Sequence, residues 1–548
     1  EVIFGLIPGE SGITKMVRLL GLMGAQPFLL EGQLFNPQKA LELGLIHEIV
    51  DTPEQLLSQA LAFIQTHPVA SHPWDQKDYK IPGGTPSNPK VAMALTVAPA
   101  MIKKTSRGLY PAPEAALAAM VEGAQVDFDT ALRIESRYLA KLCTHPVAKN
   151  MVNTFFFNMN AIKSGQSRPG SAERYQAKKV GILGAGMMGS GIAYSQAAKG
   201  ISTVLKDVSK EAAEKGKSYS HKLTQARVDK GRMSTAAQEQ LLQLILTNDS
   251  YEVLTGCDLI IDAVFENRDL KASVTQASEG KLLSTGFFAS NTSTLPISGL
   301  AKASTQAEKF IGIHFFSPVD KMKLVEIIRG KATSDETVAK AFDYVQQLGK
   351  IPIVVNDSRG FYTSRTFGTF VMEGAAMLGE GIPAAVIENA AMQVGMPVGP
   401  LAVLDETALT LSVHVLDQTR ADYALEGKTY IATPGELLVE EMVKKLARHG
   451  RAAGAGFYEY PATKGQKKYL WPDLAVHYGK ENPQYLLQDV KDRILYRQAI
   501  ETARCLTENV DIDAKKIGNS MRVDCIYNGS FAPDEFVKFE IFRFCIRV

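Results

Sequence analysis

A glycine-rich turn near the middle of the chain is the feature that most constrains its fold. Residues 184–189 read Gly-Ala-Gly-Met-Met-Gly, follow the apolar run 180–183 and open into the small-residue run 190–195. This order predicts a strand, a tight turn and the start of a helix, which together seat the pyrophosphate of a dinucleotide on the N-terminus of a helix. The alternative is a glycine-rich turn in an unrelated α/β domain.

Each glycine of the turn has a separate physical role in this prediction. Gly184 permits the tight turn, Gly186 lets the backbone approach the phosphates, and Gly189 lets helix and strand pack closely. The next apolar run, 201–205, leads through Lys206 to Asp207, whose carboxylate can accept hydrogen bonds from a ribose hydroxyl. Because Asp207 would repel a 2′-phosphate, the pattern favours NAD over NADP, although the nearby lysines weaken that preference.

Composition excludes several classes of protein. The 548 residues suggest roughly three to four domains. A net charge of +2, from 60 basic and 58 acidic residues, argues against a nucleic-acid protein. No apolar run approaches the length of a membrane span. The five cysteines are scattered and form no close metal-type pair, so we expect no metal site and a reducing compartment.

Strand and helix patterns divide the chain into several regions. We expect strands at 179–183, 201–206, 258–265, 286–289, 309–315 and 323–328, which alternate with helices. We expect a charged helical insert at 210–246, helices at 366–378, 383–394, 435–449 and from about 489, a mostly helical region at 90–165, a helix at 37–43 and a strand at 45–50. Proline- and glycine-rich stretches at 72–89 and 168–176 are typical of linkers.

Single polar residues in the apolar strands of this domain predict the chemistry. His314 can serve as a general base because imidazole titrates near neutral pH. Glu326 follows across a turn and could orient the ring through a hydrogen bond. Ser293 lies in a hydroxyl-rich cluster after another strand and could contact both substrate and cofactor. The alternative for His314 is a buried histidine with a structural role.

The combined motifs resemble the 3-hydroxyacyl-CoA dehydrogenase family over residues 177–460. The matching segments are 184–189, 263–267, 290–295, 314–319, 324–328, 360–361, 450–451 and 454–458. The resemblance implies that His314 is the catalytic base, Glu326 its partner and Ser293 a neighbour of substrate and nicotinamide. It further implies a set of residues at the cofactor: Gly184, Gly186, Met188, Gly189, Asp207, Val264, Phe265, Glu266, Lys271, Ser293 and Ser317.

The flanking regions are similar to those of a larger enzyme. Residues 1–9 resemble the crotonase (enoyl-CoA hydratase/isomerase) segment that bears the second catalytic glutamate, and Glu1 falls at that position. Residues 90–165 look like the connecting helices of the multifunctional β-oxidation enzymes, whose bacterial form is the α-subunit of the fatty-acid oxidation complex. The chain begins with Glu1 rather than Met, so it looks entered in mid-domain.

The predicted fold class is α/β plus all-α, in five regions. These are the C-terminal part of a crotonase core (1–71), a linker with connecting helices (72–176), a Rossmann-type NAD-binding domain (177–357), a helical dehydrogenase domain (358–465) and a second, incomplete helical domain (466–548).

The sequence departs from the family pattern at several places. Ser11-Gly12, preceded by Glu10, stands where the family usually has Gly-Gly, and Ser317 and Ser364 stand where it has asparagines. These serines put substrate positioning in question. Tyr527 lies in a segment that resembles one near the acyl pocket, with its glycines partly replaced. The upstream crotonase half and its oxyanion donors are missing, so Glu1 alone is expected not to support hydration.

We therefore predict an NAD-dependent L-3-hydroxyacyl-CoA dehydrogenase of fatty-acid β-oxidation. The substrate-binding residues are Ser293, Ser364 and Tyr527. Two alternatives stay open: an enoyl-CoA hydratase or isomerase as the main activity, and an NAD-binding scaffold subunit of a thiolase complex. The expected partners are an acyl-CoA thioester, a thiolase β-subunit and further copies or subunits of an oligomer. The expected location is the bacterial cytoplasm, with an organellar matrix as the alternative.

Overall fold

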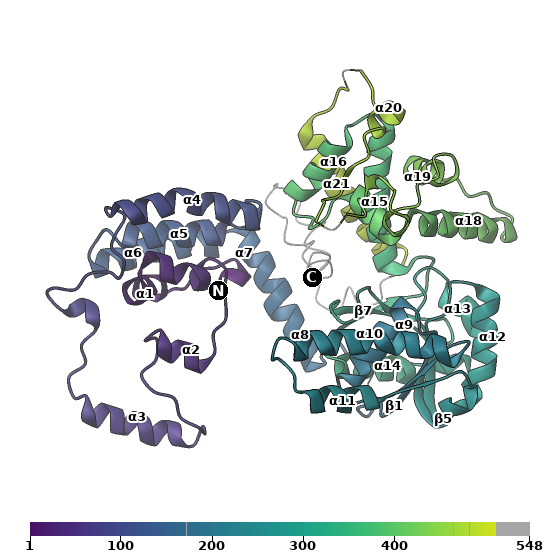
Figure 1. Ribbon diagram of the computed structural model, residues 1–548, viewed down its shortest axis with the longest axis horizontal. Coiled ribbons are helices and arrows are strands. Elements are labelled where there is room, and N and C mark those ends of the chain that lie inside the picture. Colours follow the sequence, from purple (N-terminus) through teal and green to yellow (C-terminus); the bar gives the residue numbers. More distant parts are fainter. Residues whose placement is uncertain (171, 464, 482, 511–548) are drawn as a thin grey trace. The chain divides into compact units, whose positions relative to one another are not determined.

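The computed structural model describes residues 1–170, 172–463, 465–481 and 483–510, and these form two compact units. The first unit spans Glu1–Phe157 and the second begins at Asn158. Each unit has its own buried core, and Figure 1 shows the helices and strands of both.

The first unit is helical. Its core joins the long helices α1, α4, α5 and α6 through buried side chains that include Ile13, Val17, Val91, Met120 and Leu142. The shorter helix α3 carries no buried residue. The elements are η1 (Val2–Phe4), α1 (Gly12–Leu29), α2 (Pro37–Glu42), α3 (Gln55–Thr66), η2 (Pro73–Asp75), α4 (Pro89–Ser106), α5 (Pro111–Gly123), α6 (Phe128–Cys143), α7 (Pro146–Met151) and a π-helical turn (Val152–Asn158).

One sequence prediction in this unit is wrong. Residues 45–50 form no strand, and Ile46 and Ile49 are exposed. An apolar run becomes a strand only where a neighbouring strand accepts its backbone hydrogen bonds. The helix predicted at 37–43 is confirmed as α2, whose N-cap Asn36 accepts from the backbone N–H of Lys39.

The second unit begins with an eight-stranded sheet of order β3-β2-β1-β4-β5-β6-β7-β8. All neighbours are parallel except β6 and β7, which pair antiparallel. The strands are β1 (Lys179–Leu183), β2 (Ser202–Lys206), β3 (Ile245–Asn248), β4 (Cys257–Asp262), β5 (Leu282–Ser290), β6 (Phe310–Phe315), β7 (Leu324–Arg329) and β8 (Ile351–Asn356).

Helices cover both faces of this sheet. Side chains of α9, α11 and α14 share one core cluster with β1, β4 and β6, and side chains of α12 and α13 share another with Phe288 and Phe310. The helices and short helical turns are α8 (Met159–Ser164), α9 (Met187–Ala197), α10 (Lys210–Val228), α11 (Thr235–Gln243), η4 (Tyr251–Leu254), α12 (Arg268–Ser278), η5 (Glu279–Lys281), α13 (Ile297–Leu300), η6 (Ala301–Ala303), η7 (Ala307–Lys309) and α14 (Asp335–Gln347).

A helical region follows the sheet within the same unit. Helix α15 runs through it and contacts α16, α17, α19 and α21. Its elements are α15 (Phe361–Gly379), α16 (Ala384–Gln393), α17 (Pro400–Thr407), α18 (Leu409–Leu425), α19 (Pro434–Lys444), η8 (Arg451–Ala453), β9 (Tyr458–Glu459), β10 (Tyr469–Leu470), α20 (Leu474–Tyr478) and α21 (Leu487–Thr507).

The predicted fold class is confirmed: a Rossmann-type, mostly parallel sheet precedes a mainly helical region. All six predicted strands are present, and the charged insert is the helical pair α10 and α11. The sequence reasoning missed β3, β8, α17 and α18. Among the described residues, no helix is both long and apolar enough to cross a membrane.

Candidate active site

The glycine turn joins β1 to α9 and is closed on two sides. Gly184 has a φ of +97°, and a Cβ there would lie 2.8 Å from the carbonyl oxygen of Ala263. A Cβ on Gly189 would overlap the carbonyl oxygen of Gly184. In contrast, a Cβ on Gly186 would meet nothing within 4 Å. The turn therefore leaves open space at Gly186, where the prediction places the phosphates.

Asp207, directly after β2, ties that strand to the turn. Its Oδ2 accepts a hydrogen bond of 2.5 Å from the backbone N–H of Ala185, and its Oδ1 accepts one of 2.6 Å from Val208. The N–H of Gly184 donates to the carbonyl of Lys206 at 2.8 Å. The sequence suggested a ribose ligand at Asp207, whereas the structure adds a second role, since this carboxylate also holds the turn.

Three exposed apolar side chains surround the same edge of the sheet. Met187 opens α9, Val208 follows β2 and Phe265 follows β4, and they are 72%, 88% and 86% exposed. Water-exposed apolar groups at the carboxyl ends of adjacent strands suit contact with the flat rings of a nucleotide. Val264 and Met188 are half-buried beside them and pack against the two cores. This edge fits NAD.

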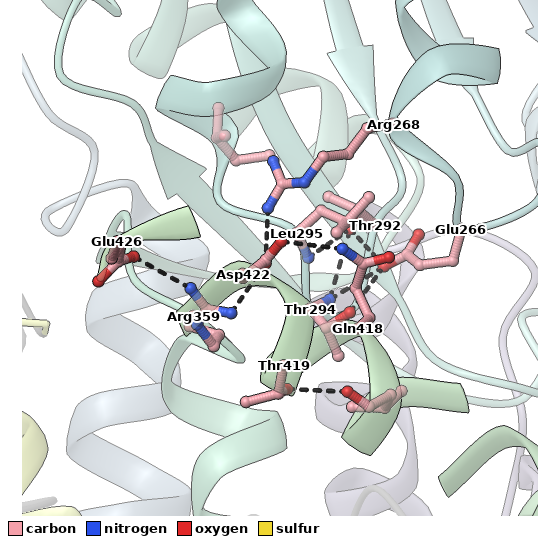
Figure 2. Close-up of polar contacts among 12 residues, drawn as sticks. Glu266, Arg268, Thr292, Thr294, Leu295, Arg359, Gln418, Thr419, Asp422 and Glu426 are labelled. Carbon is pink, nitrogen blue, oxygen red and sulfur yellow. Dashed lines mark hydrogen bonds and ion pairs between the residues drawn. The ribbon is translucent and has the colours of Figure 1, made fainter. Parts of the chain in front are cut away.

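Glu266 organises the loop after β5 (Figure 2). Its Oε1 accepts from the Thr292 hydroxyl at 2.5 Å and from the backbone N–H groups of Ser293 and Thr294 at 3.0 and 3.1 Å. Burial opposes ionisation of Glu266, but the Lys271 ammonium and these donors outweigh it and hold its pKa below the usual value. The carboxylate is therefore charged and fixes the hydroxyl-rich loop.

Lys271 lies beneath Glu266. Its side chain is 1% exposed, and its Nζ donates to Asp262 at 2.8 Å and lies 3.7 Å from Glu266. The Ser290 hydroxyl donates to the other Asp262 oxygen at 2.6 Å. The buried Lys271 ammonium thus stabilises the Glu266 carboxylate. Lys271 itself is too buried to touch a cofactor, so it can affect cofactor binding only through Glu266.

His314 and Glu326 lie directly opposite each other on the antiparallel strands β6 and β7. Residues in such register have neighbouring side chains on one face. His314 Nδ1 lies 3.0 Å from Glu326 Oε2, and the ring of Phe316 lies 4.5 Å from the imidazole, centroid to centroid. His314 is 5% exposed and Glu326 is fully buried. The pairing predicted from sequence is present.

Glu326 also receives the N-terminus of α15. Its Oε1 accepts from the backbone N–H groups of Tyr362 and Thr363, both at 3.0 Å, and its Oε2 accepts from the Thr363 hydroxyl at 2.5 Å. These three donors fix the Glu326 carboxyl group against the first turn of α15. The sequence reasoning missed Thr363. The signal was Gly360-Phe361, a glycine before a helical run.

The two predicted substrate serines lie beside one another. Ser293 is exposed, its N–H donates to Glu266 and its carbonyl accepts from the Ser364 hydroxyl at 3.1 Å. Ser317 is exposed after β6, with its hydroxyl 3.5 Å from the sulfur of Met187. Ser317 therefore lies next to the glycine turn, and Ser364 next to the loop held by Glu266.

Some predicted residues lie elsewhere. Glu1 belongs to the first unit and is exposed. Tyr527 lies outside the described residues, as do two of the five cysteines. Of the others, Cys143 is exposed, while Cys257 and Cys505 are buried. Within the part of the chain that the structure describes, no group of three or more His, Cys, Asp or Glu residues could hold a metal ion.

An open glycine turn and a carboxylate-held imidazole lie at the carboxyl edge of one Rossmann sheet. Together these features define a nicotinamide-dependent dehydrogenase. The glycine turn and Asp207 at this edge also agree with the expectation that the chain uses NAD.

Comparison with known proteins narrows this class. Residues 179–358 match the family model for the NAD-binding domain of 3-hydroxyacyl-CoA dehydrogenase, and residues 360–460 match the model for its C-terminal domain. The two matches span just over half of the chain. The chain belongs to the 3-hydroxyacyl-CoA dehydrogenase family, whose members are NAD-dependent oxidoreductases.

Individual proteins are also similar to this chain. The fatty acid oxidation complex subunit alpha of Shewanella baltica is 31% identical over 514 residues, which cover 93% of this chain and 71% of that protein. The 3-hydroxybutyryl-CoA dehydrogenase of Escherichia coli shares the fold, with a TM-score of 0.53 at 21% identity over 67% of this chain and 95% of that one. The (S)-3-hydroxybutyryl-CoA dehydrogenase of Ralstonia eutropha is 35% identical over 52% of this chain and all of that one, with a TM-score of 0.48.

Proposed function

We propose that His314 is the general base that removes the hydroxyl proton of a 3-hydroxyacyl-CoA. The contact between His314 Nδ1 and Glu326 carries this proposal. A carboxylate only accepts hydrogen bonds, so the ring proton lies on Nδ1 and the lone pair on Nε2. Nε2 is then the atom that takes the substrate proton, and the imidazolium that forms is balanced by Glu326.

The reaction removes two hydrogens from the 3-hydroxyacyl group. The hydroxyl proton passes to His314 Nε2, and the C–H bond at carbon 3 breaks as the C=O bond forms, giving 3-oxoacyl-CoA. NAD supplies the hydride acceptor when it is bound. Phe316 lies against the imidazole and helps to exclude water from it.

The remaining predicted residues receive roles by their position. Gly184, Gly186 and Gly189 would hold the pyrophosphate, Asp207 would hold the ribose, and a set of five further residues would contact the rest of the dinucleotide. That set is Met188, Val264, Phe265, Glu266 and Ser317, with Lys271 beneath it. Ser293 and Ser364 would bind the substrate near His314, because the loop held by Glu266 joins them.

The test is NADH formation from 3-hydroxybutyryl-CoA by the full chain and by His314→Gln. We expect kcat to fall on the order of 100-fold or more, as for loss of a general base, while NADH still binds. His414→Gln, at an exposed histidine of α18, is the matched control and should keep full activity. Normal turnover by His314→Gln would remove this residue from the mechanism, and a wild-type chain that binds NADH without turnover would favour the scaffold alternative.

We also propose that residues 1–71 are the C-terminal part of a crotonase domain, followed by connecting helices (72–176), the NAD-binding domain (177–357) and helical domains (358–465 and 466–548). The resemblance of residues 1–9, with Glu1 at the second glutamate position, supports this. When residues 1–548 are expressed by themselves, they supply Glu1 but no second carboxylate of the kind that the family pairs with it, so we expect them to hydrate crotonyl-CoA at least 100-fold more slowly than a hydratase that carries both. Hydration as fast as dehydrogenation would contradict the expectation that Glu1 alone does not support hydration.

The relation to a fatty acid oxidation complex subunit supports a place in β-oxidation. On this basis we propose a thiolase subunit as partner and the bacterial cytoplasm as location. Mixing the full chain with a purified bacterial thiolase subunit and measuring mass in solution tests the partnership. A mixture that shows only the separate masses would contradict it.

A further inference from the structure

A buried carboxylate on α18 joins this helix to two separate segments near the nucleotide edge (Figure 2). Asp422 Oδ2 accepts from Arg268 Nη2 at 2.9 Å and from Arg359 Nη1 at 2.8 Å, while its Oδ1 accepts from Gln418 at 2.8 Å. The Asp422 side chain is 8% exposed. Nothing in the proposed mechanism uses this cluster.

The charge of Asp422 is fixed by its partners. Burial alone would raise its pKa, but hydrogen bonds from Arg268 and Gln418 and the charges of both arginines outweigh burial and hold the pKa below the usual value. The Arg268 and Arg359 side chains are 36% and 28% exposed, so water would solvate their charges without Asp422, but Asp422 is the one acceptor in this cluster that binds both guanidinium groups. The two arginines therefore depend on Asp422 for their positions.

Arg268 stands where a cation is unfavourable on its own. It is the first residue of α12, and the N-terminus of a helix carries partial positive charge. It directly follows the segment 264–267, in which Asn267 caps α12 and its N–H donates to the Phe265 carbonyl at 2.8 Å. The end of this segment is thus tied to α18 through Asp422.

Arg359 links the same helix to the junction between the sheet and the helical region. It lies between β8 and α15, two residues before Phe361, and its guanidinium lies 5.2 Å from the ring centre of Tyr423. It also lies 3.4 Å from Glu426, which is exposed. Asp422 therefore holds both the nucleotide-facing segment and the connection to α15, whose N-terminus binds Glu326.

We propose that Asp422 is a positioning residue that couples the nucleotide-facing segment 264–267 to the helical region. Through Arg268 it fixes the start of α12, and with it Phe265 and Glu266. This inference rests on the proposed role of that segment in binding the dinucleotide. A purely structural ion pair would change thermal stability alone, whereas a positioning residue also changes nucleotide affinity.

The test is titration of the full chain with NADH, followed by fluorescence. Asp422→Asn should raise the Kd for NADH about tenfold, within the usual range of coupling between sites. Glu426→Gln is the matched control. It removes the carboxylate at the C-cap of α18, which contacts Arg359 but forms no hydrogen bond or ion pair with Arg268 in the described part of the chain, and its Kd should stay within about twofold of wild type. Equal Kd values for the two variants would overturn the proposal.

A double-mutant cycle distinguishes an effect of the Arg268–Asp422 pair on NADH affinity from a general loss of stability. Arg268→Gln should raise the Kd about as much as Asp422→Asn, and the double variant should lose little more, because the Arg268–Asp422 ion pair is lost in each variant. Additive losses, or a lower melting temperature with unchanged Kd, would overturn the proposal. If Asp422→Asn does not fold, Arg268→Lys and Arg268→Gln give the same test, with the lysine variant expected to keep part of the affinity.

NADH titration needs no turnover, so this result is independent of the catalytic base. Full activity of His314→Gln would refute the proposed mechanism and leave the coupling in place. A normal Kd in Asp422→Asn would refute the coupling and leave the role of His314 in place.

Discussion

The nucleotide turn and the catalytic pair lie at the same edge of one sheet but are built differently. The turn consists of consecutive residues. Contacts with the Ala263 carbonyl and within the turn require glycine at Gly184 and Gly189, whereas Gly186 faces open space. The pair consists of His314 and Glu326, which meet only because β6 and β7 pair antiparallel in one register. A one-residue slip of that register would turn the two side chains to opposite faces. Local chemistry defines the first region and strand pairing defines the second.

The strongest test of the second region is Glu326→Gln. The amide keeps the volume but loses the charge that orients His314 and balances the imidazolium. We expect kcat to fall on the order of 10³-fold with little change in NADH affinity, as for loss of a carboxylate partner of a catalytic histidine. Stopped-flow measurement of NADH formation checks this. Equal losses of kcat and NADH affinity would mean that the two regions are not separable.

The first region is tested by two glycine variants of the same turn. Gly189→Ala should destabilise the protein by about 1–3 kcal/mol or more, because its methyl group overlaps the Gly184 carbonyl. Gly186→Ala should leave stability within about 0.5 kcal/mol, since its methyl meets nothing, yet it should weaken NADH binding at least tenfold. Thermal melting and NADH titration of both variants check this. Tight NADH binding by Gly186→Ala would place the phosphates elsewhere.

Asp207 belongs to the turn and also bears on cofactor choice. Asp207→Asn keeps an acceptor for the Ala185 N–H but removes the charge that would repel a 2′-phosphate. We expect the preference for NADH over NADPH to fall about tenfold, roughly 1.4 kcal/mol, with the melting temperature nearly unchanged. Asp207→Ala should in addition loosen the turn. An unchanged preference in both variants would exclude the ribose role.

A last test concerns the loop that joins β6 to β7 and affects stability, not cofactor binding or turnover. Lys350 donates to the carbonyls of Val319 and Met322 at 2.5 and 2.6 Å, and burial lowers its pKa to about 8 from the ordinary 10.5. Between these values the unfolded chain holds the extra proton, so stability should rise with pH across this window, by about 1–3 kcal/mol. Lys350→Met should lack this rise. Denaturant melts at pH 7.5 and 10 test it, and parallel changes in both proteins would exclude Lys350.

The elements missed from sequence show where local patterns are insufficient. Strand β8 contains Pro352, which argues against a strand interior, and the structure accommodates it by placing β8 at the edge of the sheet. Helix α18 has no continuous apolar stripe, so periodicity did not reveal it, although it carries Asp422. Residues 45–50 have the composition of a strand but no partner strand.

The sequence alone determined the glycine turn, the six strands around it and the candidate residues His314, Glu326 and Ser293, because hydrophobic period and turn chemistry are local properties. Tertiary structure decided what those residues contact. It placed the N-terminus of α15 against Glu326, gave Asp207 a second role in holding the turn, and set Asp422 between Arg268 and Arg359. These contacts join residues far apart in the chain, and their geometry follows from strand register and helix packing, which no local pattern encodes.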